Sequence, residues 1–416
     1  MACFQGRPGG GPTPTVAPRL LISGWYGQGN LGDEAVLAGM LQTIGRALPE
    51  ARITVLSDDP PRTEREHGVK AVARDNRGPR RRLLSETLPM LRSDAFLIGG
   101  GGLVKDFGSL PGNVHGWLRP GVVARTLRRK CMWYAVGVDD LRFEESEAYA
   151  RRAAERADVL TVRDEGSARK LAATGLREEP LLTADPAIVL DDPERERSRD
   201  RPVVAVCPRH WKVASADVER PELQGRLVAE LAAALDSLHE RFDVRVAFVP
   251  FRAERGDDDR EVCAAIRDGM RHTGAAETLA LPDAPAAAAE ILASCELVVG
   301  TRLHSLILAA AGGTPFHALD YMPKVRFFCE RVGLPDHRSD IAAASEGGRL
   351  TEVLQRSFER RAATRERLRT TVPLLQRLAG LNAELLAALV TDESRLPELA
   401  DEVRGVDRTL RTARAA

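Results

Sequence analysis

RLLISGWYGQGNLGDEAVLAGM, residues 19–40, joins a short apolar run to an amphipathic segment through a turn rich in glycine. The pattern predicts a strand, a loop and a helix, whose N-terminus we place near Asp33. Helix N-termini offer free N–H groups to anions, and glycines let a ligand approach the backbone. The turn has neither Gly-x-Gly-x-x-Gly nor a Walker lysine. It therefore predicts either a substrate loop with Asn30 and Asp33 as contacts or a tight turn in which Asp33 only caps the helix.

The same alternation of apolar runs and helical segments continues along most of the chain. Strands are expected first at residues 19–24, 52–57, 69–74, 94–102, 131–138, 158–164 and 181–190. After a charged stretch without apolar periodicity, they are expected again at residues 202–209, 243–251, 296–302 and 315–320. Strands that alternate with helices predict mainly parallel sheets covered on both faces.

We therefore predict an α/β protein with two Rossmann-like, doubly wound domains facing a cleft, followed by C-terminal helices. The carboxyl edges of open parallel sheets are where such folds bind ligands. The expected divisions are a disordered segment 1–18, an N-terminal domain 19–190, a linker 191–201, a C-terminal domain 202–350 and C-terminal helices 351–416.

Composition limits the classes of partner. Sixty basic and sixty acidic residues give a formal net charge of zero, so no global field draws the chain to nucleic acid, and we expect no nucleic-acid partner. The first eighteen residues lack the apolar core of a signal peptide, and we expect no membrane-spanning run. The six scattered cysteines form no Cys-x-x-Cys pair, which favours a reduced, cytoplasmic protein without structural zinc.

Two further loops of the first domain carry candidate site residues. IGGGGLVKDF, residues 98–107, ends an expected strand with a run of four glycines. Such a run favours a close approach of a ligand to the backbone at Gly100 and Gly101. TVRDEGSARKL, residues 161–171, places Arg163 at the end of another strand. Arg163 is either a ligand contact or the partner of Asp164 in a local ion pair and cap.

In the second domain, AVCPRHWK at residues 205–212 ends a strand with Arg209, and GTRLH at residues 300–304 ends another with Arg302 and His304. Burying an arginine and a histidine between an apolar strand and an apolar helix without a function would be costly. An arginine near a histidine at a helix N-terminus forms an anion site with a proton donor at its edge.

The motifs GWYGQGNLGDEAVL, IGGGGLVKDF, YAVGV, TVRDEGSARKL, TADPA and GTRLHSLILAAAGGTPFHALDYMPKV resemble those of the polysaccharide pyruvyl transferases over residues 20–334. Within that family they resemble the bacterial branch that modifies secondary cell-wall polysaccharide for S-layer anchoring. AVGVDD, residues 135–140, departs from the commoner Gln-Gly-Ile/Val-Gly-Pro, which leaves the role of that loop open.

The resemblance implies a glycosyltransferase-B-like fold and phosphoenolpyruvate as donor substrate, without a further cofactor. The motifs contain no Asp/Glu/His cluster with metal spacing, so we expect no obligatory metal. The implied product is a cyclic 4,6-pyruvate ketal on N-acetylmannosamine of a polymeric or lipid-linked glycan, with release of phosphate. The implied donor-binding residues are Arg209, Arg302, Leu303 and His304, and we expect Gly300 and Thr301 at the same strand end to bind the donor with them. On the acceptor side we expect Gly27, Gly29, Asn30, Asp33, Gly100, Gly101 and Arg163.

His304 and Arg302 are the expected catalytic residues, because the enol carbon must be protonated and an arginine fork suits phosphate. The location implied is the cytoplasm, at the inner face of the membrane where a lipid-linked acceptor is found. Two alternatives remain open at this point. One is a nucleotide-sugar glycosyltransferase of the same fold, although the usual Glu pair is missing from residues 300–320; the other is a non-catalytic anion-binding module.

Overall fold

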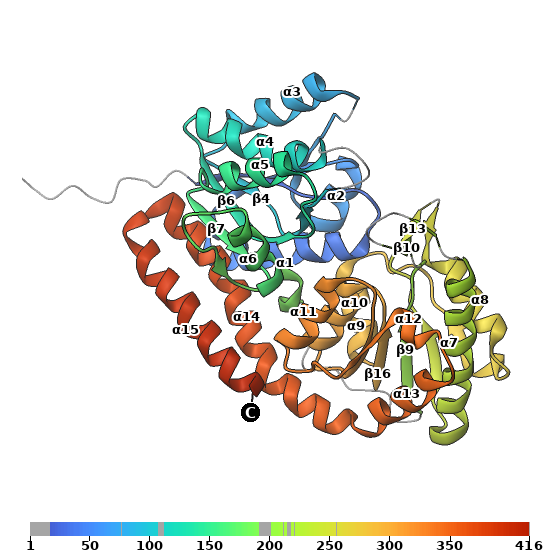
Figure 1. Ribbon diagram of the computed structural model, residues 1–416. Helices are drawn as coiled ribbons and strands as arrows, with labels where there is room; N and C mark the ends of the chain where they lie inside the picture. The colour runs from blue at the N-terminus through green and yellow to red at the C-terminus, as the bar shows by residue number, and fades with distance from the viewer. Residues whose placement is uncertain are drawn as a thin grey trace, which may run out of the picture.

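The computed structural model describes residues 17–75, 77–106, 112–190, 201–210, 212–213, 218–219, 221–254 and 256–415. Apart from residues 17, 18 and 201, the segment 1–18 and the linker 191–201 predicted from sequence lie outside the described residues. Two parallel sheets with helices on their faces form the body of the protein, and long C-terminal helices run along both (Figure 1). The predicted fold class is confirmed.

The first sheet has the strand order β3-β2-β1-β4-β6-β7-β8, with β5 pairing β6, and its strands are parallel. This order is typical of doubly wound sheets. Its strands are β1 Arg19–Ser23, β2 Arg52–Ser57, β3 Lys70–Ala73, β4 Ala95–Ile98, β5 Gly101–Val104, β6 Lys130–Val138, β7 Val159–Val162 and β8 Leu181–Leu182. The helices between them are α1 Leu31–Ala47, α2 Pro60–His67, α3 Pro79–Met90, α4 Gly112–Thr126, α5 Glu144–Ala154 and α6 Glu165–Ala173.

The second sheet has six parallel strands in the order β15-β12-β9-β16-β17-β18. They are β9 Val203–Cys207, β12 Arg245–Phe248, β15 Ala276–Thr278, β16 Leu297–Gly300, β17 Phe316–Asp320 and β18 Arg338–Asp340. Its helices are α7 Pro221–Phe242, α8 Asp259–Gly269, η2 Thr273–Ala275, α9 Pro285–Ala293, α10 Leu303–Ala311, α11 Pro323–Arg331 and α12 Ile341–Ala344. Two antiparallel ribbons complete this half: β10 Lys212–Val213 with β11 Val218–Glu219, and β13 Ala253–Glu254 with β14 Asp257–Asp258.

The strand expected over residues 181–190 is wrong beyond its first two residues. After β8 the chain turns into the short 3-10 helix η1, Pro186–Val189. Pro186 fixes its own φ and has no N–H for a sheet ladder, and the Asp185 side chain accepts a hydrogen bond from the Ala187 N–H at 3.0 Å. The apolar residues that suggested a strand are buried against α1 instead.

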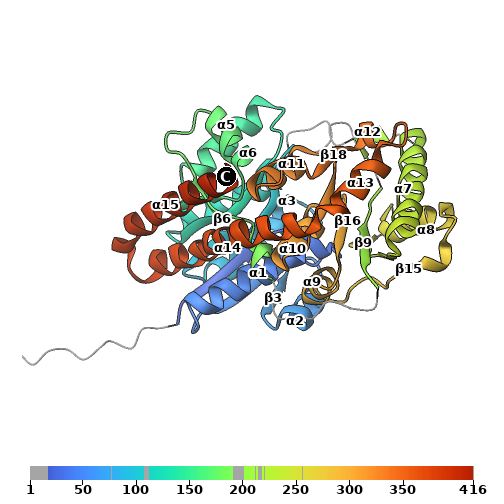
Figure 2. The same cartoon turned by 90° about the horizontal axis from the view of Figure 1, so that it is seen from below.

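The C-terminal helices are α13 Arg349–Glu359, α14 Arg361–Thr391, η3 Glu393–Arg395 and α15 Leu396–Ala415. Figure 2 shows α14 running past both sheets, so the chain returns to the first half after completing the second. Asn382 of α14 is fully buried, and its Oδ1 accepts hydrogen bonds from Thr161 at 2.6 Å and Thr183 at 3.0 Å. This contact anchors α14 to the first sheet.

By length and composition α14 could cross a membrane, which differs from the expectation drawn from sequence. However, 56% of its most apolar stretch is buried, and its side chains pack on α1, β6 and η1. This is the environment of a core helix, and the sequence alone could not show what covers its apolar face.

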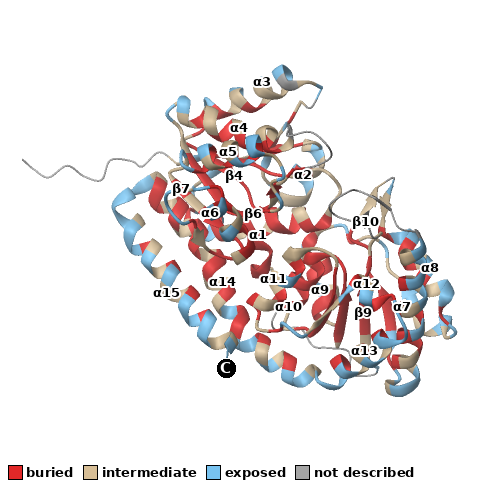
Figure 3. Ribbon diagram, viewed as in Figure 1, coloured by how far each residue is buried: buried red, intermediate tan, exposed pale blue. Residues whose placement is uncertain are grey.

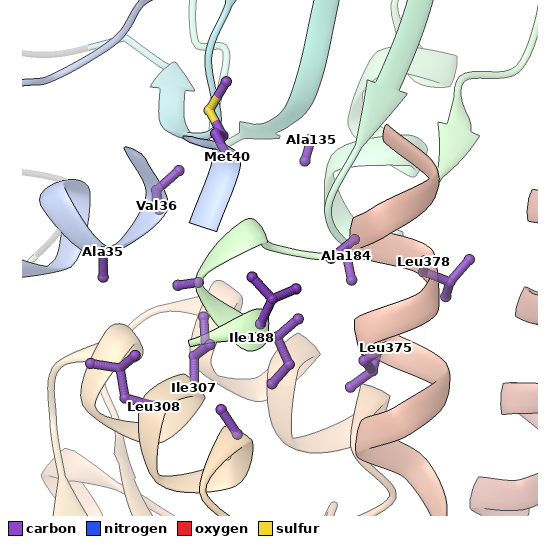
Figure 4. Packing of buried hydrophobic residues seen from close by; sticks show 14 of the residues in the cluster. Ala35, Val36, Met40, Ala135, Ala184, Ile188, Ile307, Leu308, Leu375 and Leu378 are labelled. Carbon is purple, nitrogen blue, oxygen red and sulfur yellow. The ribbon is translucent and has the colours of Figure 1, made fainter. Parts of the chain in front are cut away.

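One hydrophobic core joins the two halves. Buried side chains of α1, η1, α10 and α14 interdigitate between the sheets (Figure 4), and the strands of both sheets are buried between their helices (Figure 3). Five cysteines of the described residues are buried and form no disulfide, as expected of thiols that pack as small hydrophobes, and Cys3 lies outside those residues.

Candidate active site

A cleft of about 550 Å³ opens where the carboxyl edges of the two sheets face each other. Both halves of the chain supply its walls. The residues that line it are Trp25, Asn30, Gly32, Asp33, Gly102, Leu103, Lys105, Asp106, Asn113, Trp117, Asp139, Asp140, Arg142, Arg163, Lys170, Arg209, Phe251, Arg252, Asp257, Arg302, Leu303, His304, Tyr321, Met322, Pro323 and Lys324.

The first-domain loop of residues 24–30 is attached to the second domain at the floor of the cleft. The Leu31 N–H donates to the Phe251 carbonyl at 3.2 Å, and Asn30 forms an isolated antiparallel bridge with Arg252. Because backbone hydrogen bonds join the two halves here, the loop is held at a fixed distance from the second sheet.

Several helix N-termini open into the cleft. Among them are those of α1, α10 and α11, and Gly32, Leu303 and Pro323 of their first turns line it. Their N–H groups and dipoles favour a bound anion. Helix α1 begins at Leu31, earlier than expected, and its N-cap is Asn30, whose Oδ1 accepts from the Gly32 N–H at 3.2 Å.

The side chain of Asp33 is therefore not the helix cap. It accepts a hydrogen bond from the Asn30 Nδ2 and faces the cleft. Burial raises the pKa of Asp33 above its usual value, and the positive charges of His304 and Lys324 oppose this only in part. A buried carboxylate with a raised pKa is a stronger base than an exposed one.

His304 lies between the two domains, beside Asp185. Its Nε2 is 3.6 Å from the Asp185 Oδ2 and has no closer hydrogen-bond partner in the described structure. On its other side, the ring packs so closely on Gly32 that a Cβ added there would lie 2.2 Å from Nδ1. The imidazole is thus fixed from both sides, with Nε2 toward a carboxylate and Nδ1 toward a residue that lines the cleft.

Asp185 is held in turn by Arg163, whose Nη1 donates to its Oδ2 at 2.9 Å. Burial alone would raise the pKa of Asp185, but His304 and Arg163 hold it below its usual value. Asp185 is therefore ionised next to the imidazole. Arg163 also contacts Asp164, which caps α6 through the Ser167 N–H, and this is the local ion pair and cap that the sequence allowed. A contact between Arg163 and a ligand stays a prediction.

Arg302 is nearly buried, and its fork faces two carboxylates. Its Nε and Nη2 donate to Asp259 at 3.1 and 2.6 Å, and Nη2 also reaches Asp257 at 3.0 Å. Burial lowers the pKa of Arg302, but these carboxylates raise it by more, so the net shift is upward. Arg302 lines the cleft, and a contact between its remaining Nη1 edge and the donor substrate stays a prediction.

Arg209 and Tyr321 form a second cationic corner. The Arg209 Nη1 donates to the Tyr321 hydroxyl at 2.7 Å, and its guanidinium lies 4.9 Å above the same ring. Burial raises the pKa of Tyr321, but Lys324, Arg209 and Arg302 lower it more, to about 8. A phenol that ionises this readily indicates a strongly positive environment, which suits a multiply charged anion.

Lys105 and Asp139 line the first-domain wall of the cleft. Burial and Lys324 lower the pKa of Lys105. Burial raises the pKa of Asp139, but Lys324, Arg163 and Lys105 lower it more, so the net shift is downward. One buried oxygen of Asp139 has no hydrogen-bond partner among the described residues. Asp139 and Asp140 belong to the loop that departs from the family pattern, and the structure brings both to the cleft.

The structure thus brings Asn30, Asp33, Arg163, Arg209, Arg302, Leu303 and His304 together from the predicted set. Gly27, Gly29, Gly100, Gly101, Gly300 and Thr301 do not line the cleft, and their contact with substrate stays a prediction. Gly27 has a φ of +76° and donates to Glu34 at 2.8 Å, so it shapes the loop. A Cβ on Gly100 would lie 2.7 Å from Val36, which indicates tight packing on α1.

Sequence reasoning missed Asp185, Tyr321 and Lys324 as site residues. Tyr321 and Lys324 follow β17, the neighbour of β16, and the rule that carboxyl ends of parallel strands share one edge could have found them. Asp185 lies in the motif TADPA, but the strand expected over residues 181–190 placed it inside a strand and not at the carboxyl end of one.

Among the described residues, one group could supply metal ligands: Glu34, Glu66 and His67. They already pair with protein groups. The His67 Nε2 contacts Glu34 at 2.9 Å, and Glu66 accepts from Arg62 at 2.5 Å. The group joins α1 to α2 behind the cleft wall, and its contacts account for it as a structural link.

Solved structures with the same two-sheet architecture have low sequence identity to this chain. A UDP-bound MnaA from S. aureus is 10% identical, with a TM-score of 0.60 over 91% of this chain and 97% of that chain. A UDP-GlcNAc 2-epimerase from Neisseria meningitidis is 9% identical, with a TM-score of 0.58 over 90% and 99%. A trehalose 6-phosphate synthase from Burkholderia multivorans is 9% identical, with a TM-score of 0.55 over 92% and 100%. At these identities the likeness shows the fold alone.

Sequence comparisons are more specific. The amylovoran biosynthesis protein AmsJ of Erwinia amylovora is 38% identical over 63 residues, which is 15% of this chain and 15% of that protein. The family model for polysaccharide pyruvyl transferase matches residues 30–322, a stretch that contains Asn30, Asp185 and the Arg302–His304 segment. The chain therefore belongs to the polysaccharide pyruvyl transferase family.

Proposed function

We propose that this enzyme transfers the pyruvyl group of phosphoenolpyruvate to two neighbouring hydroxyls of a glycan sugar, forming a cyclic ketal and releasing phosphate. The observation that carries the proposal is the position of His304, fixed between Asp185 and Gly32 at the edge of a cationic cleft. The cleft offers a proton donor, several cations and helix N-termini within one space.

Phosphoenolpyruvate carries a carboxylate and a phosphate, so its site must supply several positive groups. Arg209, Lys105 and Lys324 line the cleft together with the N-termini of α10 and α11. Arg302 has its fork toward Asp259, and we assign it to holding the junction of β14 and α8 in place while its outer edge faces the donor. The donor is thus bound mainly by the second domain.

The chemistry begins with protonation of the enol carbon C3 by the imidazolium of His304, while Asp185 orients the ring. C2 then accepts one acceptor hydroxyl, which forms a C–O bond and gives up its proton. The C2–O bond to phosphate breaks, and the second hydroxyl closes the ring at C2 and gives up its proton. One released proton restores His304 and the other leaves with phosphate, so the reaction consumes no further reagent.

Asp33 is the candidate base for the attacking hydroxyl. It lies on the first-domain wall with a raised pKa and next to Asn30, whose amide can bind a sugar hydroxyl. Trp25 and Trp117 contact each other on the same wall, with ring centroids 5.5 Å apart and ring planes tilted by 45°. Aromatic faces commonly bind sugar rings, which supports acceptor binding by the first domain.

For the acceptor we propose N-acetylmannosamine of a cell-wall polysaccharide or its lipid-linked precursor, with the ketal across O4 and O6. The family name supports a polysaccharide acceptor, and the motif resemblance supports the S-layer branch. With a lipid-linked acceptor, the enzyme acts in the cytoplasm at the inner face of the membrane.

The experiment is an assay of phosphate release from phosphoenolpyruvate with a synthetic lipid-linked disaccharide that ends in β-linked N-acetylmannosamine. Mass spectrometry of the acceptor should show the gain of one pyruvyl ketal. The alternative function is that of a glycosyltransferase, and its support is the fold that this chain shares with structures that contain UDP or UDP-GlcNAc. It predicts instead that a UDP-sugar adds a sugar mass to the same acceptor without consuming phosphoenolpyruvate.

A further inference from the structure

Helix α3 carries an unusual outer surface. Among the described residues, the exposed large hydrophobic side chains are Leu84, Leu88 and Leu91, which are 60%, 61% and 45% exposed. Their spacing of four and three residues puts them on one helix face. Figure 1 shows α3 at the outer end of the first half, on the far side of α4 from the second sheet.

The outer surface of α3 is also basic. Arg80 and Arg81 are exposed one turn before Leu84, and Arg92 is exposed just after Leu91. Glu86, the acidic residue of this helix, is 1% exposed and pairs on the inner side with Arg74 and Arg82. The surface that faces solvent therefore combines apolar side chains with positive charge only, although the whole chain has no net charge.

The inner side of α3 is one side-chain layer from the cleft. The Arg82 guanidinium lies 5.0 Å above the ring of Trp117, and Trp117 lines the cleft on the acceptor wall. A surface bound by the outer face of α3 would thus lie beside the entrance through which an acceptor reaches Trp25 and Trp117.

We propose that Arg80, Arg81, Leu84, Leu88, Leu91 and Arg92 form a docking surface for an anionic lipid bilayer. Apolar side chains insert at the level of the headgroups, and arginines bind lipid phosphates, a combination typical of interfacial helices. The charge identifies this occupant, since a surface with three exposed arginines and no exposed acid complements a negatively charged membrane. The assignment extends the proposed function, because it brings the enzyme to a lipid-linked acceptor.

Vesicle co-sedimentation of the full chain tests the docking surface without any substrate. Wild-type protein should bind vesicles of phosphatidylcholine and phosphatidylglycerol in a 7:3 ratio and lose at least about tenfold in affinity on phosphatidylcholine alone. Leu84→Ser/Leu88→Ser and Arg80→Glu/Arg81→Glu should each cause a loss of the same order. Arg404→Glu/Arg408→Glu, the same charge reversal at exposed sites of α15, is the control and should bind like the wild type.

Binding that survives in both α3 variants, or its absence in the wild type, would overturn the proposal. So would a wild-type dimer that the leucine variant converts to monomer, because the face would then be an interface between copies. Phosphate release with a detergent-solubilised short-chain acceptor should be unchanged in the α3 variants. A failure of that assay in the wild type would count against the proposed function and not against the docking surface.

Discussion

The imidazole of His304 lies 3.6 Å from the carboxylate of Asp185, and the two residues come from different halves of the chain. His304 stands in the first turn of α10 in the second domain, whereas Asp185 caps η1 in the first. The pair exists only when both domains are packed together. The common core of α1, η1, α10 and α14 therefore sets the distance between the imidazole of His304 and the carboxylate of Asp185.

Asp185→Asn tests whether Asp185 positions His304. An amide keeps the shape but removes the charge that fixes the Nε2 proton, so we expect kcat to fall at least about tenfold with little change in the KM for phosphoenolpyruvate. Asp164→Asn is the matched control, because it also removes a partner of Arg163 but does not face His304. It should lower the melting temperature without a selective loss of turnover, and equal kcat values in the two variants would refute the positioning role.

Gly32→Ala tests the close packing of α1 on His304. A Cβ at this position would lie 2.2 Å from the Nδ1, so the ring must move, and we expect kcat to fall by at least about tenfold. Gly45→Ala in the same helix meets nothing within 4 Å and should raise stability slightly without affecting kcat. Steady-state kinetics with thermal melts of both variants decide the matter, and normal turnover in Gly32→Ala would show that the ring can move without loss.

The lowered pKa of Tyr321 predicts that donor binding depends on pH. Its pKa of about 8 means that a phenolate forms beside Arg209 above that pH, where it repels an anionic substrate. The Kd of wild-type protein for phosphoenolpyruvate should rise by up to about tenfold per pH unit above pH 8, more steeply than in Tyr321→Phe. Tyr149→Phe, outside the cleft lining, is the control. Parallel Kd curves for wild type and Tyr321→Phe in titration calorimetry would remove Tyr321 from the donor site.

The lowered pKa of His317 predicts that the stability of the protein, and not its activity, depends on this group as the pH changes. It is fully buried between Ser357 and Ser339, and burial lowers its pKa from 6.5 to about 3. Below pH 6.5 the unfolded state takes up a proton that the folded state does not, so stability falls by about 1.4 kcal/mol per pH unit as the pH drops toward 3. Urea unfolding from pH 7 to pH 4 should show a shallower decline in His317→Gln, and identical slopes would refute the assignment.

The alternation of strands and helices could be predicted from sequence because each strand of a parallel sheet is a short apolar run between helical periods. The cleft residues Arg209, Arg302 and His304 could be predicted for the same reason, since each follows such a strand. The partners of these residues could not. Asp259 meets Arg302 through the ribbon β13–β14, whose two-residue strands leave no periodic signal.

The sequence also could not predict which of the glycines belong to the site. Four glycines after β4 indicated a ligand, but a Cβ on Gly99 would lie 2.3 Å from the buried Tyr26 hydroxyl, and the one on Gly100 would meet α1. Two of these glycines are thus needed for packing between loops that are distant in sequence. Glycine runs show that something approaches the backbone, and only the tertiary structure shows what it is.

The most direct test is pyruvyl transfer in D2O followed by mass spectrometry of the product. If His304 protonates C3 of phosphoenolpyruvate, the ketal methyl group should carry one deuterium that does not wash out in H2O. A folded His304→Gln enzyme should form this product roughly 10²–10⁴-fold more slowly, while His317→Gln retains the rate. A ketal methyl without deuterium, or a near-normal kcat in folded His304→Gln, would contradict the assignment of His304 as the general acid.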